Sequence, residues 1–113
     1  MRATALIYPP EPDKPVRTVE LTDPKCLRFL QSEVDGFVEV VPHFNHVVHE
    51  GVRQPCVVFC NENGKLERLP YNGRATVLWE DALPPPHTLL NPVDFLVGTI
   101  VVLICDEEFR EEL

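Results

Sequence analysis

The chain has 113 residues, of which 44% are hydrophobic, so it is long enough for one domain with one core and too apolar for a disordered protein. Its formal net charge is −8, which argues against a broad nucleic-acid-binding surface because such surfaces cluster Lys and Arg. Its longest apolar run, 100–105, is too short to span a bilayer, and no N-terminal signal is visible. We expect a single domain, residues 1–113, in a cytoplasm, with four free thiols.

Two strands and a proline-rich turn open the chain. Ala3–Tyr8 and Val16–Leu21 have strand composition, and the prolines of Pro9–Pro15 exclude a helix between them. We expect these two strands to pair as a hairpin.

The segment that follows is the clearest helix. Asp23 suits the N-cap, Pro24 suits the first helical position and Gly36 suits the C-terminal cap. Between them, apolar residues at helical spacing form a stripe for the core: Leu27, Leu30 and Val34.

The middle of the chain is predicted to be the centre of the sheet. Gly36–Pro42 is a strand, Pro42–Pro55 is a loop and Cys56–Cys60 is a second strand. Asn63-Gly64 favours a type I′ hairpin turn, because both central residues of that turn need positive φ. A third strand, Lys65–Leu69, is therefore expected to pair with the second.

The C-terminal part contains one ambiguous segment and one apolar strand. Ala75–Glu80 has strand-like composition, but the spacing of its apolar residues fits a short helix, which we assign. Pro84-Pro85-Pro86 predicts an extended stretch and Asn91-Pro92 a turn. Phe95–Ile104 is apolar on both faces and is expected to be a central strand, and Asp106–Leu113 a final helical turn.

The predicted fold is α+β. It comprises a mostly antiparallel sheet of about five strands with one main helix packed on one face.

A metal site is the first chemical hypothesis, because imidazole and thiolate are zinc ligands. His43, His46 and His49 lie three residues apart, and Cys56 and Cys60 follow. On a strand at about 3.3 Å per residue the two cysteines lie roughly 13 Å apart, too far to share one ion. We predict no metal and no cofactor, with three histidines and one cysteine as the set that a metal site would use.

Catalytic groups are poorly represented. Cys60 near a histidine could form a thiolate pair, but a cysteine in an apolar strand ordinarily acts as a small hydrophobe. Ser32 is the single serine, and it lies on the predicted helix. The paired carboxylates lie in expected loops and the tail, so we predict that the protein is not an enzyme.

Four segments, in this order, resemble a small domain-of-unknown-function family common in bacteriophages, plasmids and integrated mobile elements: Gly36–Pro42, Val58–Leu66, Leu69–Ala75 and Val97–Val102. The resemblance runs from about Leu21 to Ile104. It implies a shared fold, a mobile-element origin in a bacterial cytoplasm and an accessory or counter-defence role. The chain departs from the pattern by a longer histidine-bearing loop and by Gly73 before Arg74.

The same resemblance suggests where an exposed site would lie. Tyr71, Asn72 and Arg74 are the candidates, because core packing does not obviously require them. The competing interpretation is that Asn72-Gly73 is merely a turn.

The leading functional hypothesis is a non-enzymatic protein that binds a host or mobile-element protein, as a counter-defence inhibitor, through its acidic surface and the loop bearing His46 and His49. The first alternative is a small-ligand or nucleotide-binding oligomer. It would use these side chains: Tyr71, Arg74, Arg53 and Trp79. The second alternative is a metal-binding module or metal-dependent enzyme. Nucleic-acid and membrane partners are not expected.

Overall fold

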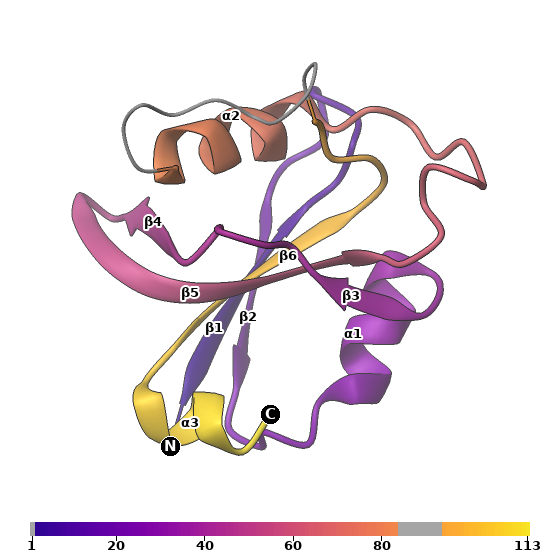
Figure 1. Cartoon of the computed structure of the whole chain (residues 1–113). Helices are drawn as coiled ribbons and strands as arrows, with labels where there is room; N and C mark the ends of the chain where they lie inside the picture. Colours follow the sequence, from indigo (N-terminus) through magenta and orange to yellow (C-terminus); the bar gives the residue numbers. More distant parts are fainter. Residues whose placement is uncertain (1, 84–93) are drawn as a thin grey trace.

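The computed structural model describes residues 2–83 and 94–113 (Figure 1). In this part of the chain it contains six strands and three helices. In chain order they are β1 (Ala3–Tyr8), β2 (Arg17–Leu21), α1 (Leu27–Val34), β3 (Val38–Val40), β4 (His46–His49), β5 (Val52–Asn61), α2 (Gly73–Ala82), β6 (Ile100–Cys105) and α3 (Glu107–Glu111). None of the helices in the described residues is long and apolar enough to cross a membrane.

The strands form an antiparallel sheet in the order β2-β1-β6-β5-β3. β4 pairs with the first half of β5, beyond the end of β3. The predicted β1–β2 hairpin is confirmed, with Ala3 opposite Leu21. β6, fully buried, lies between β1 and β5, as its apolar run predicted. The α+β class and the mostly antiparallel sheet are therefore confirmed.

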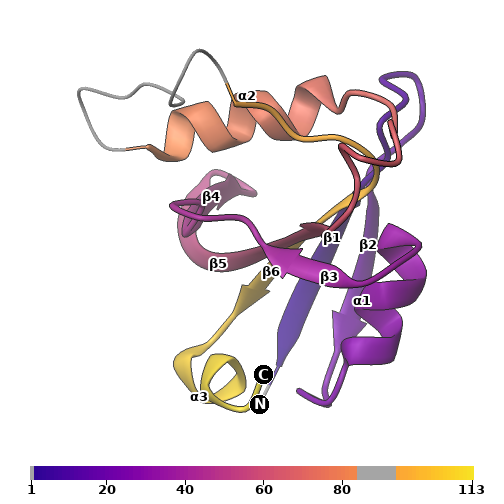
Figure 2. The ribbon, with the colours of Figure 1, turned by 45° about the vertical axis from the view of Figure 1, so that its right-hand side comes forward.

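Helices cover both faces of this sheet (Figure 2). One core cluster joins Trp79 of α2 to Val58 and Val102 of the sheet. The other joins Leu30 of α1 and Phe109 of α3 to the opposite face. The prediction of one main helix on one face is thus incomplete, because α2 is an additional helix on the face away from α1.

α1 begins later than the sequence suggested. Its N-cap is Cys26, while the Asp23 carboxylate accepts a hydrogen bond from the Lys25 N–H at 2.9 Å in the preceding turn. Asp35, at φ 58°, occupies the left-handed position that ends the helix. The predictions of Asp23 as N-cap and of Gly36 as C-terminal cap are therefore wrong. Gly36 instead leaves room for the Asn61 side chain.

The predicted hairpin at Asn63-Gly64 is also wrong. Residues 62–68 form successive turns, with the Glu67 N–H donating to the Asn63 carbonyl at 2.9 Å. The Asn61 side chain accepts from the Asn63 N–H at 2.8 Å and so starts this turn. Lys65–Leu69 consequently does not pair with β5, whose edge at this point is taken by β3.

A two-residue turn with positive φ occurs instead inside the expected Pro42–Pro55 loop. Glu50 and Gly51 have φ of 52° and 78° between the paired residues His49 and Val52. Both central residues are left-handed, as a type I′ turn requires. Part of the predicted loop is therefore the β4–β5 hairpin.

The C-terminal elements agree more closely. α2 confirms the helical assignment of Ala75–Glu80, and α3 confirms the final helical turn. β6 is shorter than the predicted Phe95–Ile104 strand, because Gly98 at φ 72° interrupts extended backbone before it. The predictions for Pro84-Pro85-Pro86 and Asn91-Pro92 lie outside the described residues.

Candidate functional site

The candidate site is a cavity of about 180 Å³ beside β3, which we call the β3 groove. Its walls come from β3 with the residues that follow it, from the end of β5 with the next turn, from Trp79 of α2 and from residues 94–97. Trp79 is fixed in place because its indole N–H donates to the Pro42 carbonyl at 2.9 Å. Sites for drug-sized ligands measure about 300–1,000 Å³, so this groove suits one or two side chains of a partner better.

Lys65 contacts both Asp94 and Phe95 in one wall of the groove. The Lys65 ammonium pairs with the Asp94 carboxylate and lies 4.7 Å from the centre of the Phe95 ring. Burial alone would raise the pKa of Asp94, but hydrogen bonds from the Lys65 ammonium and the Phe95 N–H outweigh it and lower that pKa. Asp94 is therefore ionised at neutral pH, and the pair carries no net charge.

Two other carboxylates at the groove have no such partner. Glu39 and Glu62 are exposed, and neither takes part in an ion pair among the described residues. Both line the β3 groove: Glu39 lies opposite Cys60 in the sheet, and Glu62 is the first residue of the turn that follows β5. An apolar side chain is exposed beside them, because Leu66, which also lines the groove, is 85% accessible. The groove thus combines negative charge with apolar contact surface.

The Cys60 thiol in the groove is not an activated nucleophile. Burial, with the neighbouring Glu39 carboxylate, raises its pKa to about 11. Because thiolate is the reactive form, such a thiol is mostly protonated and unreactive near neutral pH. Burial raises the pKa of Cys56 further, to about 12.

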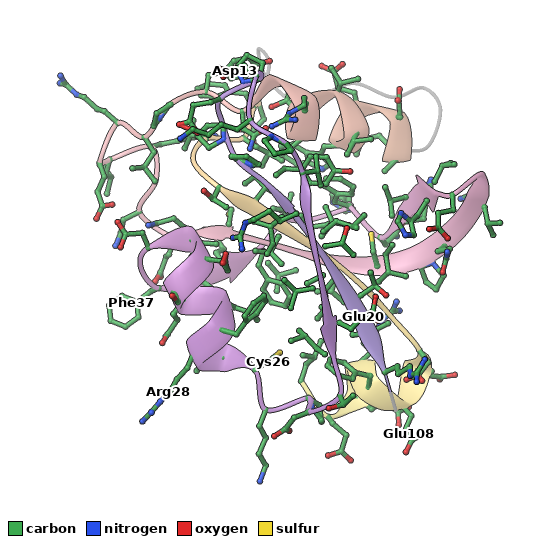
Figure 3. The ribbon with its side chains drawn as sticks, turned by 180° about the vertical axis from the view of Figure 1, so that it is seen from behind. Asp13, Glu20, Cys26, Arg28, Phe37 and Glu108 are labelled. Atoms are coloured by element: carbon green, nitrogen blue, oxygen red, sulfur yellow. The ribbon has the colours of Figure 1, made fainter. Side chains whose placement is uncertain are left out.

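A second, larger cavity of about 550 Å³ lies on the other face of β3. It is lined mainly by apolar side chains of α1, β3 and β5: Cys26, Leu27, Leu30, Val38 and Phe59. Figure 3 shows Cys26 at the start of α1 and Arg28 pointing away from the protein. β3 therefore separates an acidic groove from an apolar cavity.

The predicted site at the start of α2 is largely structural. Asn72 is fully buried and caps α2, with its side-chain oxygen accepting from the Ala75 N–H at 3.1 Å. Its amide donates to the Tyr8 and Gly98 carbonyls, each at 2.9 Å. The expectation that packing does not need Asn72 is therefore wrong, and the residue is more than the turn offered as the competing interpretation.

Arg74 and Tyr71 flank this cap differently. The Arg74 guanidinium donates to the Pro9 and Glu11 carbonyls, each at 3.0 Å, and so fastens the β1–β2 loop to α2. Tyr71 is exposed and packs edge-on against Phe95, with ring centres 6.0 Å apart. Of the three predicted residues at this point, Tyr71 is the one that offers an accessible ring, next to a groove residue.

The other predicted residues belong to the β4–β5 hairpin. His46 and Arg53 are in contact, with Arg53 Nη2 3.3 Å from His46 Nδ1, and His49 lies 4.0 Å from the Glu50 carboxylate. Figure 1 shows this hairpin at one end of the molecule, apart from the start of α2, which Asn72 caps. The structure therefore divides the predicted binding residues between two separate regions.

His46 and His49 do not converge on one point. His46 and His49 are three residues apart on a strand, so their side chains leave β4 on opposite faces. No group of three His, Cys, Asp or Glu side chains within 2–83 and 94–113 is arranged to hold a metal ion. The nucleotide set is likewise dispersed, because Trp79 is buried, Arg74 binds backbone carbonyls and Arg53 is on the hairpin.

A family model matches residues 1–112 of the chain. The chain belongs to the family described as domain of unknown function (DUF3846). The resemblance to a domain of unknown function is thereby confirmed and extended over nearly the whole sequence. No curated protein and no solved structure matches this DUF3846 chain at a significant level.

The groove of this DUF3846 chain was not predicted from its sequence. Lys65 was expected at the start of a strand paired with the preceding one, whereas it pairs with Asp94, 29 residues further along. The exposure of Leu66 indicates a contact surface, but it can be recognised only once the surrounding turn is known. No local pattern links position 39 to positions 62 and 95, since the fold alone brings them together.

Proposed function

We propose that this DUF3846 protein is a non-enzymatic binding protein that engages a protein partner through the β3 groove. The observation that carries the proposal is a cavity of side-chain size, bordered by Glu39 and Glu62 without cationic partners in the described chain and by exposed Leu66. Such a surface favours a partner that presents both basic and apolar side chains. The unreactive Cys60 thiol supports binding over catalysis at this site.

The biological setting follows from the motif resemblance. We propose that the protein is an accessory protein of a phage or mobile element in a bacterial cytoplasm, and that it inhibits a host defence protein by binding it. A chain of net charge −8 is well suited to associate with a basic partner, because opposite charges accelerate encounter.

The test is native mass spectrometry of the protein purified from lysate of its own host. Two variants are compared, each with two carboxylates replaced by lysine, so that both change from −8 to −4. The groove variant is Glu39→Lys with Glu62→Lys. The control is Asp13→Lys with Glu111→Lys, at exposed positions in the β1–β2 loop and in α3; Figure 3 shows Asp13 apart from Phe37, which precedes β3.

We expect a partner protein that co-purifies with the wild type and the control and is lost from the groove variant. Retention of the partner by the groove variant would place the interface elsewhere. Equal loss from both variants would show that only overall charge matters.

A small-ligand function is the second candidate, favoured by the 550 Å³ apolar cavity, which falls within the usual range for ligand sites. In the same experiment it would appear as a small nonprotein mass on a bare chain or oligomer. Replacing Leu27, which lines the cavity and is half exposed, by arginine should remove that mass.

A further inference from the structure

Among the strands of residues 2–83 and 94–113, β3 is the last on its side of the sheet, and no described strand pairs with its outer edge (Figure 2). The Phe37 carbonyl accepts from the Glu62 N–H at 2.8 Å, and the Val41 N–H donates to the Val58 carbonyl at 2.8 Å. In an antiparallel ladder, residues that bond to the partner strand alternate with residues whose backbone groups point the other way. The N–H and C=O groups of Val38 and Val40 therefore point outward.

The two faces beside this edge differ in chemistry. Glu39 lies on the α2 face with Cys60 and borders the β3 groove. Val38 and Val40 lie on the α1 face, opposite Asn61 and Phe59, and Val38 with Phe59 lines the apolar cavity. A strand added to this edge would direct alternate side chains to these two faces.

We propose that the partner binds by strand addition to β3, as an extended segment in which basic and apolar residues alternate. This inference rests on the proposed function and specifies its partner. Basic side chains would face Glu39 and Glu62, and apolar side chains would lie beside Val38 and Val40. Main-chain hydrogen bonds to the β3 edge supply affinity, and the alternation supplies specificity.

The charge at the centre of β3 selects this occupant over a second copy of the chain. Antiparallel self-pairing centred on β3 would place the two Glu39 carboxylates directly opposite each other, where like charges are destabilising. A lysine or arginine in that place forms a favourable cross-strand pair. An exposed edge strand with an apolar side chain at each end, Val38 and Val40, otherwise invites pairing.

The probes are two capped peptides of one composition, Lys-Val-Lys-Val-Lys-Val and Lys-Lys-Lys-Val-Val-Val. Binding is measured by calorimetry, and the contact is located by NMR of the backbone amides. We expect the alternating peptide to bind at least about tenfold more tightly, and the Val38 and Val40 amides to become protected from exchange. Equal affinities, or absence of binding by both, would overturn strand addition.

Backbone methylation of the peptide tests the ladder without altering the protein. Two versions of the alternating peptide carry N-methyl groups on its odd or its even residues. We expect one version to lose at least about tenfold in affinity and the other to lose little, because only every second N–H can face β3. A slip by one residue cannot compensate, since it would turn the lysines to the apolar face. Equal affinities of the two versions would contradict the proposal.

A proline variant tests the protein side. In Val40→Pro the outward N–H is removed, a change that edge strands tolerate. The matched control is Val48→Pro on β4. There the Cys56 N–H donates to the Asn45 carbonyl, so by the same alternation the N–H of Val48 points away from β5. The two side chains are similarly exposed, Val48 65% and Val40 54%. We expect Val40→Pro alone to weaken the alternating peptide about tenfold. Equal binding by both folded variants would overturn the proposal.

The proposed function and this inference fail separately. If Val40→Pro keeps the lysate partner while Glu39→Lys with Glu62→Lys loses it, the groove binds a protein but not by strand addition. If the groove charges can be reversed without losing the partner, the proposed function fails whatever the proline variant does.

Discussion

Two buried asparagines join segments that are far apart in the chain. Asn61 donates to the Val34 and Asp35 carbonyls at 3.1 and 3.2 Å, which closes the end of α1. Asn72 caps α2 and ties β1 to the segment before β6. A buried amide that satisfies several backbone groups is costly to lose, because each orphaned group keeps its desolvation penalty.

The first prediction concerns Asn72. Replacing it by alanine removes the hydrogen bond that caps α2 and the two hydrogen bonds that the amide donates to backbone carbonyls. We therefore expect a loss of roughly 3 kcal/mol in the free energy of unfolding. Asn72→Ser keeps an acceptor for the cap and should lose less. Chemical denaturation measures both. A loss in Asn72→Ala below about 0.5 kcal/mol would mean that the side chain is structurally dispensable and free for a ligand.

The second prediction concerns Gly36. A Cβ there would lie 2.6 Å from the Asn61 amide nitrogen, so glycine is needed for space and not for φ. We expect Gly36→Ala to lower the unfolding free energy by about 2 kcal/mol, and by about 1 kcal/mol less when Asn61 is already alanine. Gly51→Ala is the control. Its φ of 78° is strained for alanine, but an added Cβ would meet no neighbouring side chain within 4 Å. The loss of unfolding free energy in Gly51→Ala should therefore not depend on Asn61. Strict additivity of Gly36→Ala with Asn61→Ala would refute the clash.

At the scale of elements, β5 carries two thiols whose pKa values burial raises, Cys56 to about 12 and Cys60 to about 11. The folded state holds these protons more tightly than the unfolded state, whose thiols titrate near 9. The stability from this difference is complete below about pH 9 and decreases as pH rises toward the folded values.

The third prediction follows from that sign. Between pH 8 and 10 the free energy of unfolding should fall by about 1 kcal/mol on account of Cys56 alone. Cys56→Ala should be less stable at pH 8 but should show a smaller decrease over the same range. Urea denaturation at several pH values measures this, and parallel curves for the two proteins would contradict the assignment.

Strands and helices were predictable where periodicity and composition act locally. β1, β2 and β6 were recovered, and α2 was chosen correctly from apolar spacing despite strand-like residues. Turns were less predictable. Asn63-Gly64 has the preferred residues for a hairpin turn. In the structure, however, Gly64 packs closely against Val97, so that a Cβ added at Gly64 would lie 2.9 Å from a Val97 methyl carbon. The actual hairpin turn uses Glu50, which intrinsic preference does not favour at positive φ.

The candidate site was less predictable than the fold, for a physical reason. A groove depends on which side chains remain exposed after distant segments pack, and the pairing of Lys65 with Asp94 leaves Glu39 and Glu62 without a described cation. Asn72 was a candidate because core packing does not obviously require an asparagine at this position. Asn72 is instead completely buried, and its amide is satisfied there by the carbonyls of Tyr8 and Gly98, which are remote in sequence.

At the scale of the whole molecule, the net charge of −8 bears on the rate of association. The fourth prediction is that the association rate of the Lys-Val-Lys-Val-Lys-Val peptide falls at least about threefold when salt rises from about 20 to about 200 mM, because salt screens long-range attraction. Stopped-flow fluorescence or surface plasmon resonance measures it.

The lysine variants give that experiment its control. Both have a net charge of −4, so the groove variant should show a weaker salt dependence than the Asp13→Lys, Glu111→Lys variant only if the attraction is local to the groove. Identical slopes would assign steering to the total charge.

The place of β6 in the sheet also constrains how the chain can be assembled during synthesis. β6 follows the other five described strands along the chain, yet it pairs with β1 on one side and β5 on the other. Until residues 100–105 have left the ribosome, the native pairings of the described strands are limited to two separate pieces, β1–β2 and β3–β4–β5, each with an edge that later pairs with β6. A ribosome stalled before that point would therefore display exposed strand edges, the kind of surface that chaperones recognise.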